Sequence, residues 1–441
     1  MNPSRLFVAP YEDAAVAALF SDAAWIKAMV RTETTLAQAQ AKIGLIPPET
    51  AAAITARAET FSPDLARLHA ATARDGFPII ELIAQLKTHV GPDAAKWIHW
   101  GATTQDVMDN ALVAQISGAF QFIEQSLVRT TQALTTLAKQ HRATLMVGRT
   151  HLQPALPITF GLQAAAWLAP LLRHRRRLAE LRPRLQVLQC GGAAGTLASL
   201  GHQGPALARA WAAALGVGVP PMPWHAQRDS ILETAHWLGL VGGSLAKFAQ
   251  DVLLLTQAEI AELQESADGT GGGSSAMPQK RNPTSSETIL VAVRSAAAHL
   301  TALQSSPPPE LQRGTQTAQL ELIHLPRLLA LTGGALLASD RLAHQLVVYP
   351  ARMQANLAAT HGTLLAEAAT LALSAHLDPT DARALVREAC AAAVTEKRHL
   401  VDILRERVTA PVGWGELRNE THQLGSTDSF IDAVLAAAAV S

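Results

Sequence analysis

Apolar residues recur every three or four positions along the middle of the chain, a spacing that predicts long amphipathic helices. The first apolar stripe starts at Leu112 and runs to about Gln140. At 1.5 Å per residue, a helix of about 30 residues is about 45 Å long. The same spacing predicts four more long helices, at about 158–186, 229–265, 284–304 and 316–345. Turn-rich breaks separate these stretches, and nothing strand-like is expected between them.

The pattern divides the chain into three helical domains and predicts an all-α fold. Residues 1–110 alternate short helical patterns with turns, residues 111–348 contain the long helices and a glycine-rich loop at 269–283, and residues 349–441 return to shorter helices. Long helices without intervening strands predict a central five-helix bundle. Two of these helices are apolar on nearly every side, so we expect other subunits to cover the faces that one chain leaves open.

The composition favours a helical cytoplasmic protein and argues against several partners. Alanine and leucine, both strong helix formers, dominate the sequence. Acidic and basic residues balance at 36 each, so the basic surface typical of nucleic-acid binding is not expected. The N-terminal segment does not resemble a secretory signal, and no apolar run reaches the ~20 residues that span a bilayer. We therefore expect no membrane association.

The cysteines and the other metal-binding residue types give no sign of a metal centre. Cys190 and Cys390 lie far apart and lack metal-ligand spacing, a usage typical of a reducing compartment. His, Asp and Glu residues do not cluster at metal-ligand spacing either. We expect no bound metal and no disulfide framework.

The most informative segment is the glycine-rich stretch from Gly271 to Pro283. Its glycines allow backbone conformations closed to other residues and expose N–H groups to a ligand. Hydroxyl, cationic and amide side chains follow, at Ser274, Ser275, Lys280, Arg281 and Asn282. Such a loop can surround an anion with donors while it presents one hydroxyl to a reacting carbon. Glycine and serine alone would suggest a surface linker, but the dense MPQKRNP sequence argues against it.

This stretch resembles the signature loop of the fumarase/aspartase superfamily, GSSxMPxKxNP, with every fixed position present. Residue by residue, the resemblance implies that Ser274 is the catalytic serine and that Lys280 and Asn282 bind a substrate carboxylate. Ser275 and Arg281 are further candidate ligands in the same loop. The resemblance also implies that the loop is mobile and closes over the substrate.

Two further segments resemble the other active-site stretches of the superfamily. In GATTQD (101–106), Thr103 and Thr104 match hydroxyls that bind a substrate carboxylate. In GRTHLQP (148–154), Thr150 and His151, with Gln153 after them, match a stretch that brings an imidazole to the reaction centre. A lone histidine in a helical protein is more often structural, but these neighbours favour the catalytic interpretation.

The resemblance extends over nearly the whole chain, and the segments occur in the expected order. It implies a homotetramer in which each active site takes segments from three subunits around a shared helical core. This assembly would also account for the helices that are apolar on nearly every side. The resemblance further implies a small polycarboxylate substrate and no redox cofactor.

The amino-acid sequences of several segments favour one branch of the superfamily. Fumarases and aspartases usually differ around the loop lysine, and adenylosuccinate lyases carry a histidine that the stretch 74–82 lacks. By contrast, IHWGAT (98–103), GGAAGTLA (191–198) and PWHAQRD (223–229) are similar to the bacterial carboxymuconate cycloisomerases. That branch implies closure of 3-carboxy-cis,cis-muconate to a carboxymuconolactone, a step of protocatechuate degradation through the β-ketoadipate pathway.

One stretch departs from this branch and leaves different substrates open. Cycloisomerases commonly have Glu-Arg followed by an aromatic-rich stretch ending in Glu-Trp, whereas this chain has Gln312-Arg313 and then Glu321-Leu322. Arg313 remains a candidate ligand for a third carboxylate, although an analogue such as a sulfonated muconate would also fit. The sequence also leaves open a fumarate-releasing lyase of the adenylosuccinate type and a non-catalytic homologue.

The expected chemistry is addition of an internal carboxylate across a carbon–carbon double bond. Ser274 would carry the proton at the α-carbon, and the cationic, donor-rich loop would stabilise the dianionic intermediate. His151 would bind or polarise the attacking carboxylate, or share the proton transfer. The sequence leaves these roles of His151 open.

Overall fold

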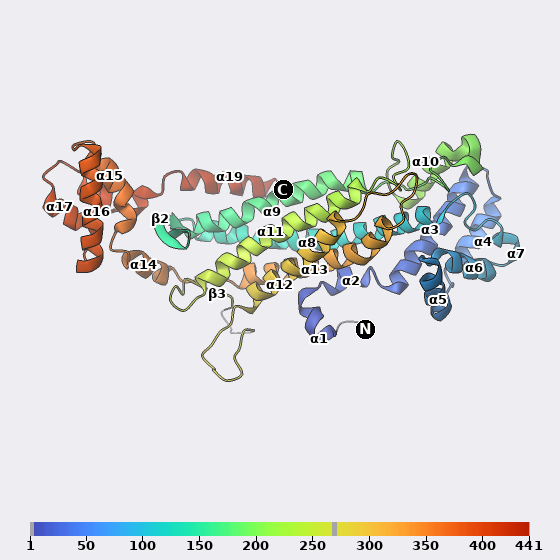
Figure 1. Ribbon diagram of the computed structural model, residues 1–441, viewed down its shortest axis with the longest axis horizontal. Coiled ribbons are helices and arrows are strands. Elements are labelled where there is room, and N and C mark those ends of the chain that lie inside the picture. Colours follow the sequence, from blue (N-terminus) through green and yellow to red (C-terminus); the bar gives the residue numbers. More distant parts are fainter. Residues whose placement is uncertain (1–3, 267–270, 441) are drawn as a thin grey trace. The chain divides into compact units, whose positions relative to one another are not determined.

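Helices make up most of the protein in the computed structural model, which describes residues 4–266 and 271–440 (Figure 1). The predicted all-α fold class is confirmed. The first two residues of the loop predicted at 269–283 lie outside the described residues.

All of the predicted long helices are present. They are α8 (Thr104–Gln140), α9 (Phe160–Leu185), α11 (Asp229–Leu255), α12 (Thr284–Gln304) and α13 (Thr317–Gln345). The helix expected to continue to 265 ends instead at Leu255, because the chain turns there. Ala261 takes a left-handed φ of 51°, and its N–H donates to the Gln257 carbonyl at 2.7 Å.

The expectation that nothing strand-like separates the long helices is wrong. An antiparallel hairpin of β1 (Leu145–Thr150) and β2 (Gln153–Thr159) lies between α8 and α9 in the sequence. Its prolines and Gly148 gave the segment the composition of a turn, although the backbone pairs from Leu145↔Thr159 onward. A second antiparallel pair joins β3 (Leu263–Gln264) to β4 (Val347–Val348).

The chain forms two compact units, each of which contains part of every long helix. The first unit comprises residues 1–125, 176–242 and 291–335, and the second comprises 126–175, 243–290 and 336–441. The division into three domains at 110 and 348 stays a prediction.

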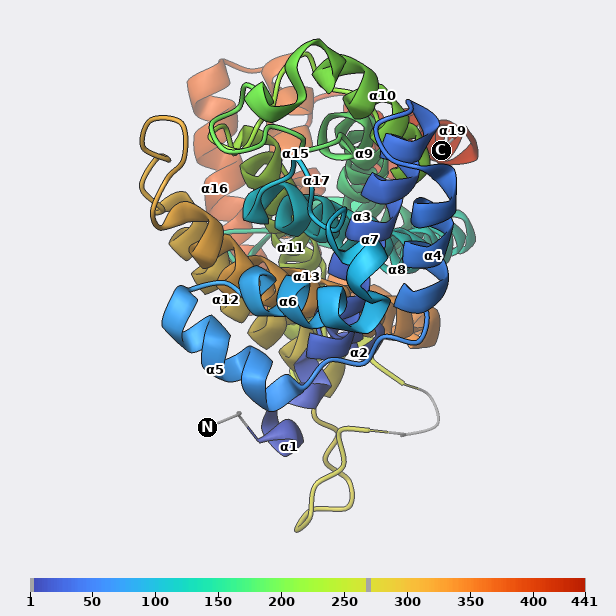
Figure 2. The same ribbon diagram turned by 90° about the vertical axis from the view of Figure 1, so that its right-hand side faces the viewer.

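Helices α3 to α7 of the first unit form a core beside the start of α8. Apart from the long helices, this unit contains α1 (Arg5–Val8), α2 (Ala14–Ala18), α3 (Asp22–Lys42), α4 (Pro48–Ala58), α5 (Leu65–Asp75), α6 (Ile79–Val90), α7 (Pro92–Ala95) and α10 (Gly204–Leu215). Figures 1 and 2 show α4 and α6 side by side, and α5 beside α6. Ile54 and Leu82 are fully buried there, and the cluster continues to Met108 and Ala111 of α8. Burial of this apolar area holds the N-terminal end of α8.

The second unit ends in a smaller helical core. Its helices are α14 (Pro350–Ala358), α15 (Ala366–Ser374), α16 (Pro379–Glu396), α17 (Leu400–Arg407), α18 (Trp414–Arg418) and α19 (Thr427–Ala439). The caps fit the sequence: Asp378 accepts the Thr380 N–H at 2.8 Å at the start of α16. Buried residues such as Leu373, Val386 and Leu404 then join α15, α16 and α17 (Figure 1).

Single 3-10 turns complete the described elements. They are η1 (Ala9–Tyr11), η2 (Ala198–Gln203), η3 (Thr363–Leu365) and η4 (Glu420–Gln423).

By length and composition alone, α11 and α13 could each cross a membrane. Core helices of soluble proteins pass the same test, and 67% of the most apolar window of α13 is already buried.

Candidate active site

The hydroxyls of Thr103 and Thr104 lie where the chain enters α8, and a buried carboxylate organises this turn. Asp106 is fully buried and accepts the backbone N–H of Thr103 at 3.1 Å. It also accepts the N–H groups of Gly191 and Gly192, both at 2.9 Å. One side chain therefore joins the threonine turn to the distant glycine pair.

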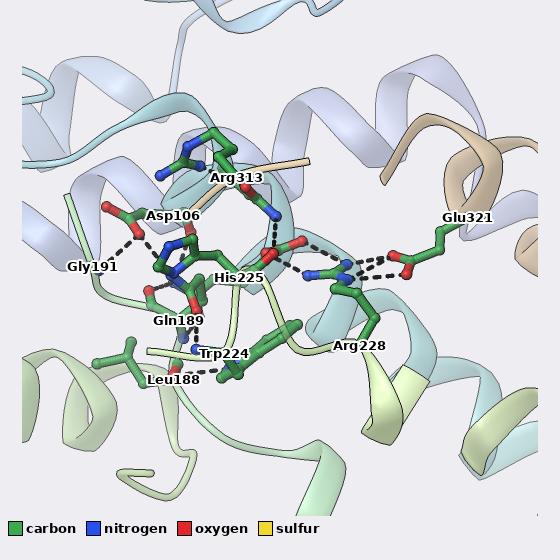
Figure 3. A network of polar contacts seen from close by, with 12 residues as sticks. Asp106, Leu188, Gln189, Gly191, Trp224, His225, Arg228, Arg313 and Glu321 are labelled. Atoms are coloured by element: carbon green, nitrogen blue, oxygen red, sulfur yellow. Dashed lines mark hydrogen bonds and ion pairs between the residues drawn. The ribbon is translucent and has the colours of Figure 1, made fainter. Parts of the chain in front are cut away.

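Asp106 receives a fourth hydrogen bond from Gln189 Nε2 at 3.1 Å, which Figure 3 shows beside the contact to Gly191. Burial raises the pKa of Asp106, and its four hydrogen bonds oppose that rise. Among the described residues, no cation pairs with this carboxylate. Neutral donors alone thus satisfy a buried carboxylate at this point.

Arg313 lies next to this network, and in the described part of the chain its guanidinium donates hydrogen bonds to neutral oxygens alone. Its Nη1 donates to Gln105 Oε1 at 2.5 Å, and its Nη2 donates to the carbonyls of Gly192 at 2.9 Å and Ala193 at 3.2 Å. Within residues 4–266 and 271–440, no carboxylate forms an ion pair with Arg313. A half-buried guanidinium without a counter-ion is a ready site for a substrate carboxylate.

His225 lies in the same network (Figure 3). Burial lowers its pKa, the charge of Arg313 lowers it further, and Asp106 opposes the shift. The imidazole is therefore neutral at physiological pH, which leaves Arg313 as the cation of this part of the site.

A buried ion cluster closes the other side. Arg228 donates to Asp109 through Nη1 at 2.8 Å and Nη2 at 3.0 Å, and it also pairs with Glu321. Figure 3 shows the guanidinium of Arg228 facing the carboxylate of Glu321. All three residues are at most 4% exposed. Two carboxylates share one arginine, so the cluster has a formal charge of −1 when both are ionised.

These groups surround a cavity of about 270 Å³ in the first unit. Its polar lining includes Thr103, Thr104 and Arg313. Its apolar lining includes Phe77, Met108, Leu112 and Leu322. The threonines and the arginine were predicted from the sequence, whereas the buried cluster was not.

The Thr150-His151 segment forms the end of the β1–β2 hairpin in the second unit. Thr150 pairs with Gln153, so His151 and Leu152 are the two residues of the turn. Their φ angles are 49° and 64°, in the left-handed region that a tight hairpin turn of this length requires. Neither residue is glycine, so the backbone stores strain beside the candidate catalytic imidazole.

A buried ion pair anchors this hairpin. Arg149 donates to the fully buried Glu262 through Nη2 at 2.8 Å and Nη1 at 3.0 Å. Asn356 of α14 donates to the same carboxylate at 2.8 Å. His151 itself is exposed and lines a cavity of about 560 Å³ with Lys247 and other residues of α11.

The signature loop folds back on itself at its stem. The Asn282 N–H donates to the Gly272 carbonyl at 2.7 Å, and Gly273 forms a bridge with Arg281. Gly272 has a φ of 67°, and a Cβ there would lie 2.2 Å from the Asn282 carbonyl oxygen. Only glycine fits this close approach. The Ser274 hydroxyl accepts the Met277 N–H at 3.1 Å, which fixes a local turn.

Glu265 holds the point where the loop enters α12. Its carboxylate accepts the N–H groups of Ser285 and Ser286, both at 2.8 Å. These groups would otherwise have no helical partner, so Glu265 caps α12. This cap was not predicted from the sequence. The usual capping residue directly precedes its helix, whereas Glu265 is separated from the start of α12 by the whole signature loop.

The structure brings some predicted residues together and leaves others in separate places. Thr103, Thr104 and Arg313 line one cavity, whereas Arg281 and Asn282 line another of about 170 Å³. Ser275 and Lys280 are exposed on the loop, and Ser274 is half-buried. Thr150 and Gln153 are exposed on the hairpin. Residues from the three predicted segments therefore line three different cavities in the described part of the chain.

A helical fold with a cavity lined by Thr103, Thr104 and Arg313 at the start of α8 and a GSSxMPxKxNP loop before α12 is typical of one class of metabolic enzymes. The family model described as lyase matches residues 10–297, and the chain belongs to this family, the fumarase/aspartase superfamily. It is an enzyme chain similar over nearly its full length to cycloisomerases of that family.

Named relatives show the extent of this similarity. The 3-carboxy-cis,cis-muconate cycloisomerase of Pseudomonas aeruginosa is 40% identical, over 98% of this chain and 96% of the relative. The structure of the 3-carboxy-cis,cis-muconate lactonizing enzyme of Pseudomonas putida superposes with a TM-score of 0.91 at 37% identity, over 99% of both chains. The fumarate lyase of Mesorhizobium sp. BNC1 has a TM-score of 0.89 at 39% identity, over 97% of this chain and 98% of that one.

Proposed function

We propose that this enzyme closes 3-carboxy-cis,cis-muconate to a carboxymuconolactone in aromatic-compound degradation. The observation that carries the proposal is Arg313, a cation whose hydrogen-bond partners among the described residues are all neutral oxygens, in the cavity with Thr103 and Thr104. A polycarboxylate supplies the missing anion there. The cycloisomerase from Pseudomonas aeruginosa, 40% identical, supports the choice of substrate.

The reaction forms one C–O bond and moves one proton. An oxygen of an internal carboxylate attacks a carbon of the diene, and the electron pair of that double bond moves to the neighbouring α-carbon. The adjacent carboxylate takes up this charge as a dianionic aci-carboxylate. A proton then joins the α-carbon and completes the lactone. Stabilisation of the dianion is the main task of the protein, and one preorganised donor is typically worth about 3–4 kcal/mol.

The signature loop supplies this stabilisation in our proposal. Ser274 delivers the proton to the α-carbon, while Lys280 and Asn282 bind the carboxylate that becomes a dianion. Arg281 and the backbone N–H of Ser275 add donors from the same loop. The close approach of Gly272 to Asn282 supports a fixed stem from which these groups project.

The hairpin supplies His151. Its imidazole binds or polarises the attacking carboxylate, or shares the proton transfer, with Thr150 and Gln153 as neighbouring ligands. The strained turn at φ 49° and the buried Arg149–Glu262 pair support a preorganised position for this ring. A positioned acid or base of this kind contributes about 10²–10⁴-fold.

We also propose a homotetramer in which subunits share active sites. Three observations support it: residues of the predicted segments line three different cavities, Ser275 and Lys280 are exposed, and Leu240, Val291 and Ile323 are 42–52% exposed on three long helices. Mixing two inactive variants tests the sharing. Ser274→Ala and His151→Ala subunits, dissociated and reassembled together, regain activity if sites are shared, and remain inactive if each chain holds a whole site.

Product analysis tests the function itself. The purified enzyme is incubated with 3-carboxy-cis,cis-muconate in D₂O, and the product is examined by NMR. The proposal predicts a lactone with one deuterium on the α-carbon.

The similarity to a fumarate lyase favours a second candidate, a fumarate-releasing lyase. Fumarate release from adenylosuccinate or argininosuccinate, with no lactone from muconate, would favour that candidate.

A further inference from the structure

Two chemically different groups of residues line the cavity in the first unit. The hydroxyls of Thr103 and Thr104 and the charge of Arg313 can attract an anion. The side chains of Met108 and Leu322 are apolar, and because they also line a neighbouring cavity, they mark the end at which the two cavities adjoin. A ligand with one carboxylate and one apolar part matches this arrangement.

The buried ion cluster strengthens the contrast between the ends. Asp109 and Glu321 both line the cavity, and each forms an ion pair with Arg228. Arg228 is 4% exposed and is already occupied by two carboxylates, so it cannot bind a third without displacing one. A second ligand carboxylate beside this cluster would meet a formal charge of −1 whenever Asp109 and Glu321 are both ionised; burial raises the pKa of Glu321, and the charge of Arg228 lowers it. Like charges at this depth repel strongly.

A second, apolar cavity adjoins the first. It measures about 200 Å³, and Met108 and Leu322 line both cavities. Trp25, Ile26 and Leu68 also line it. The two spaces therefore share a wall made of two flexible apolar side chains.

We propose that Leu322 and Met108 set the substrate specificity at this end, where the site takes an uncharged apolar group rather than a further carboxylate. The accepted substrates then include polycarboxylates that carry an alkyl substituent, which extends past Leu322 toward the second cavity. This inference rests on the proposed function for the carboxylate at Arg313. It goes beyond that function by assigning a chemical class to the opposite end.

Binding of simple monocarboxylates tests the inference without turnover. Acetate, butyrate and hexanoate are titrated into the full-length enzyme by calorimetry. Burial of each added methylene at the apolar end predicts an affinity gain of about fourfold. Arg313→Gln should weaken the whole series, since all members share the carboxylate. Equal affinity for acetate and hexanoate, or a series unaffected by Arg313→Gln, would overturn the inference.

Variants of Leu322 test whether this side chain controls the gain in affinity with chain length. Leu322→Trp fills the shared wall and should remove the gain with chain length while acetate binds as before. Leu371→Trp, the same change at a leucine that is 69% exposed on α15, should leave the gain intact. Leu322→Ala opens the wall and should extend the gain to octanoate. A slope unchanged in both Leu322 variants would contradict the proposal.

The outcomes separate this inference from the proposed function. A chain-length series that follows the predictions, from an enzyme that leaves 3-carboxy-cis,cis-muconate unchanged, supports the apolar end and rejects the muconate substrate. Lactone formation by an enzyme that binds acetate and hexanoate with equal affinity supports the muconate substrate and rejects the apolar end.

Discussion

Asp106 accepts the backbone N–H of Gly192 at 2.9 Å, and the carbonyl of the same glycine accepts a hydrogen bond from Arg313. Gly192 thus connects the buried carboxylate to the cation of the cavity. Asp106 also accepts the N–H of Thr103. One carboxylate therefore positions both the threonine turn and the arginine, although it lines no part of the cavity itself.

Asp106→Asn should weaken substrate binding more than it slows the chemical step. The amide nitrogen of asparagine cannot accept the N–H groups that the carboxylate accepts, and each lost bond to a charged group costs about 1.5–3 kcal/mol. We expect KM to rise about tenfold or more with a smaller change in kcat, measured by steady-state kinetics. Asp22→Asn, at an exposed acid, is the control. A fall in kcat at unchanged KM would contradict the positioning role.

Replacement of Arg313 separates charge from geometry. Arg313→Gln should raise KM about 10- to 100-fold, because it removes a charged donor of a substrate carboxylate. Arg313→Lys keeps the charge but loses the planar fork, so its KM should lie between those of the wild type and Arg313→Gln. Equal KM values for all three enzymes would show that Arg313 does not touch the substrate.

The pKa of His225 reports on Arg313. Because the folded pKa lies below the ordinary value of 6.5, the unfolded chain binds a proton first as the pH falls. Neutral His225 therefore contributes fully to the free energy of unfolding above pH 6.5, and this contribution is lost as the pH falls toward the pKa of the folded state. Arg313→Gln should raise the folded pKa, but burial, the larger cause, should keep it below 6.5.

Titration of the imidazole resonances by NMR checks this shift, with His225→Gln to assign the signal. Arg74→Gln, which changes an exposed arginine, should leave the pKa of His225 unaltered. An identical pKa in the wild type and Arg313→Gln would mean that the two side chains do not interact electrostatically.

Arg228 should be essential for stability. Arg228→Met leaves Asp109 and Glu321 buried without a cation, a change that typically costs about 3–5 kcal/mol. Adding Asp109→Asn and Glu321→Gln to Arg228→Met should restore part of the loss, because neutral side chains need no counter-ion. Denaturant unfolding measures the effect. A single variant as stable as the wild type would contradict the burial of this cluster.

Local sequence patterns were enough to predict the helical fold class and the starts of α9, α11, α12 and α13, whereas α8 begins at Thr104 rather than at the predicted Leu112. The stripe from Leu112 onward belongs to α8, and Leu112 and Ile116 are fully buried as that periodicity requires. Residue types in a dense motif also identified the loop that ends at Pro283. These features depend on neighbours within a few positions along the chain.

Other features depend on distant residues and could not be predicted in this way. The cluster of Asp109, Arg228 and Glu321 joins α8, α13 and the residue just before α11, and no spacing within one segment reveals it. The hairpin turn was missed for a different reason. Its residues, His151 and Leu152, lack the Asn-Gly or Asp-Gly signal of a two-residue turn, because the left-handed backbone is imposed on ordinary side chains.

The most direct test of the proposed reaction is the ultraviolet absorbance of 3-carboxy-cis,cis-muconate mixed with the purified enzyme or with the Ser274→Ala variant. Ring closure breaks the conjugated diene, so we predict rapid loss of its absorbance band with the wild type and at least about a hundredfold slower loss with the variant. A band that persists with the wild-type enzyme would contradict the cycloisomerase function. Equal rates for both proteins would contradict the role of Ser274.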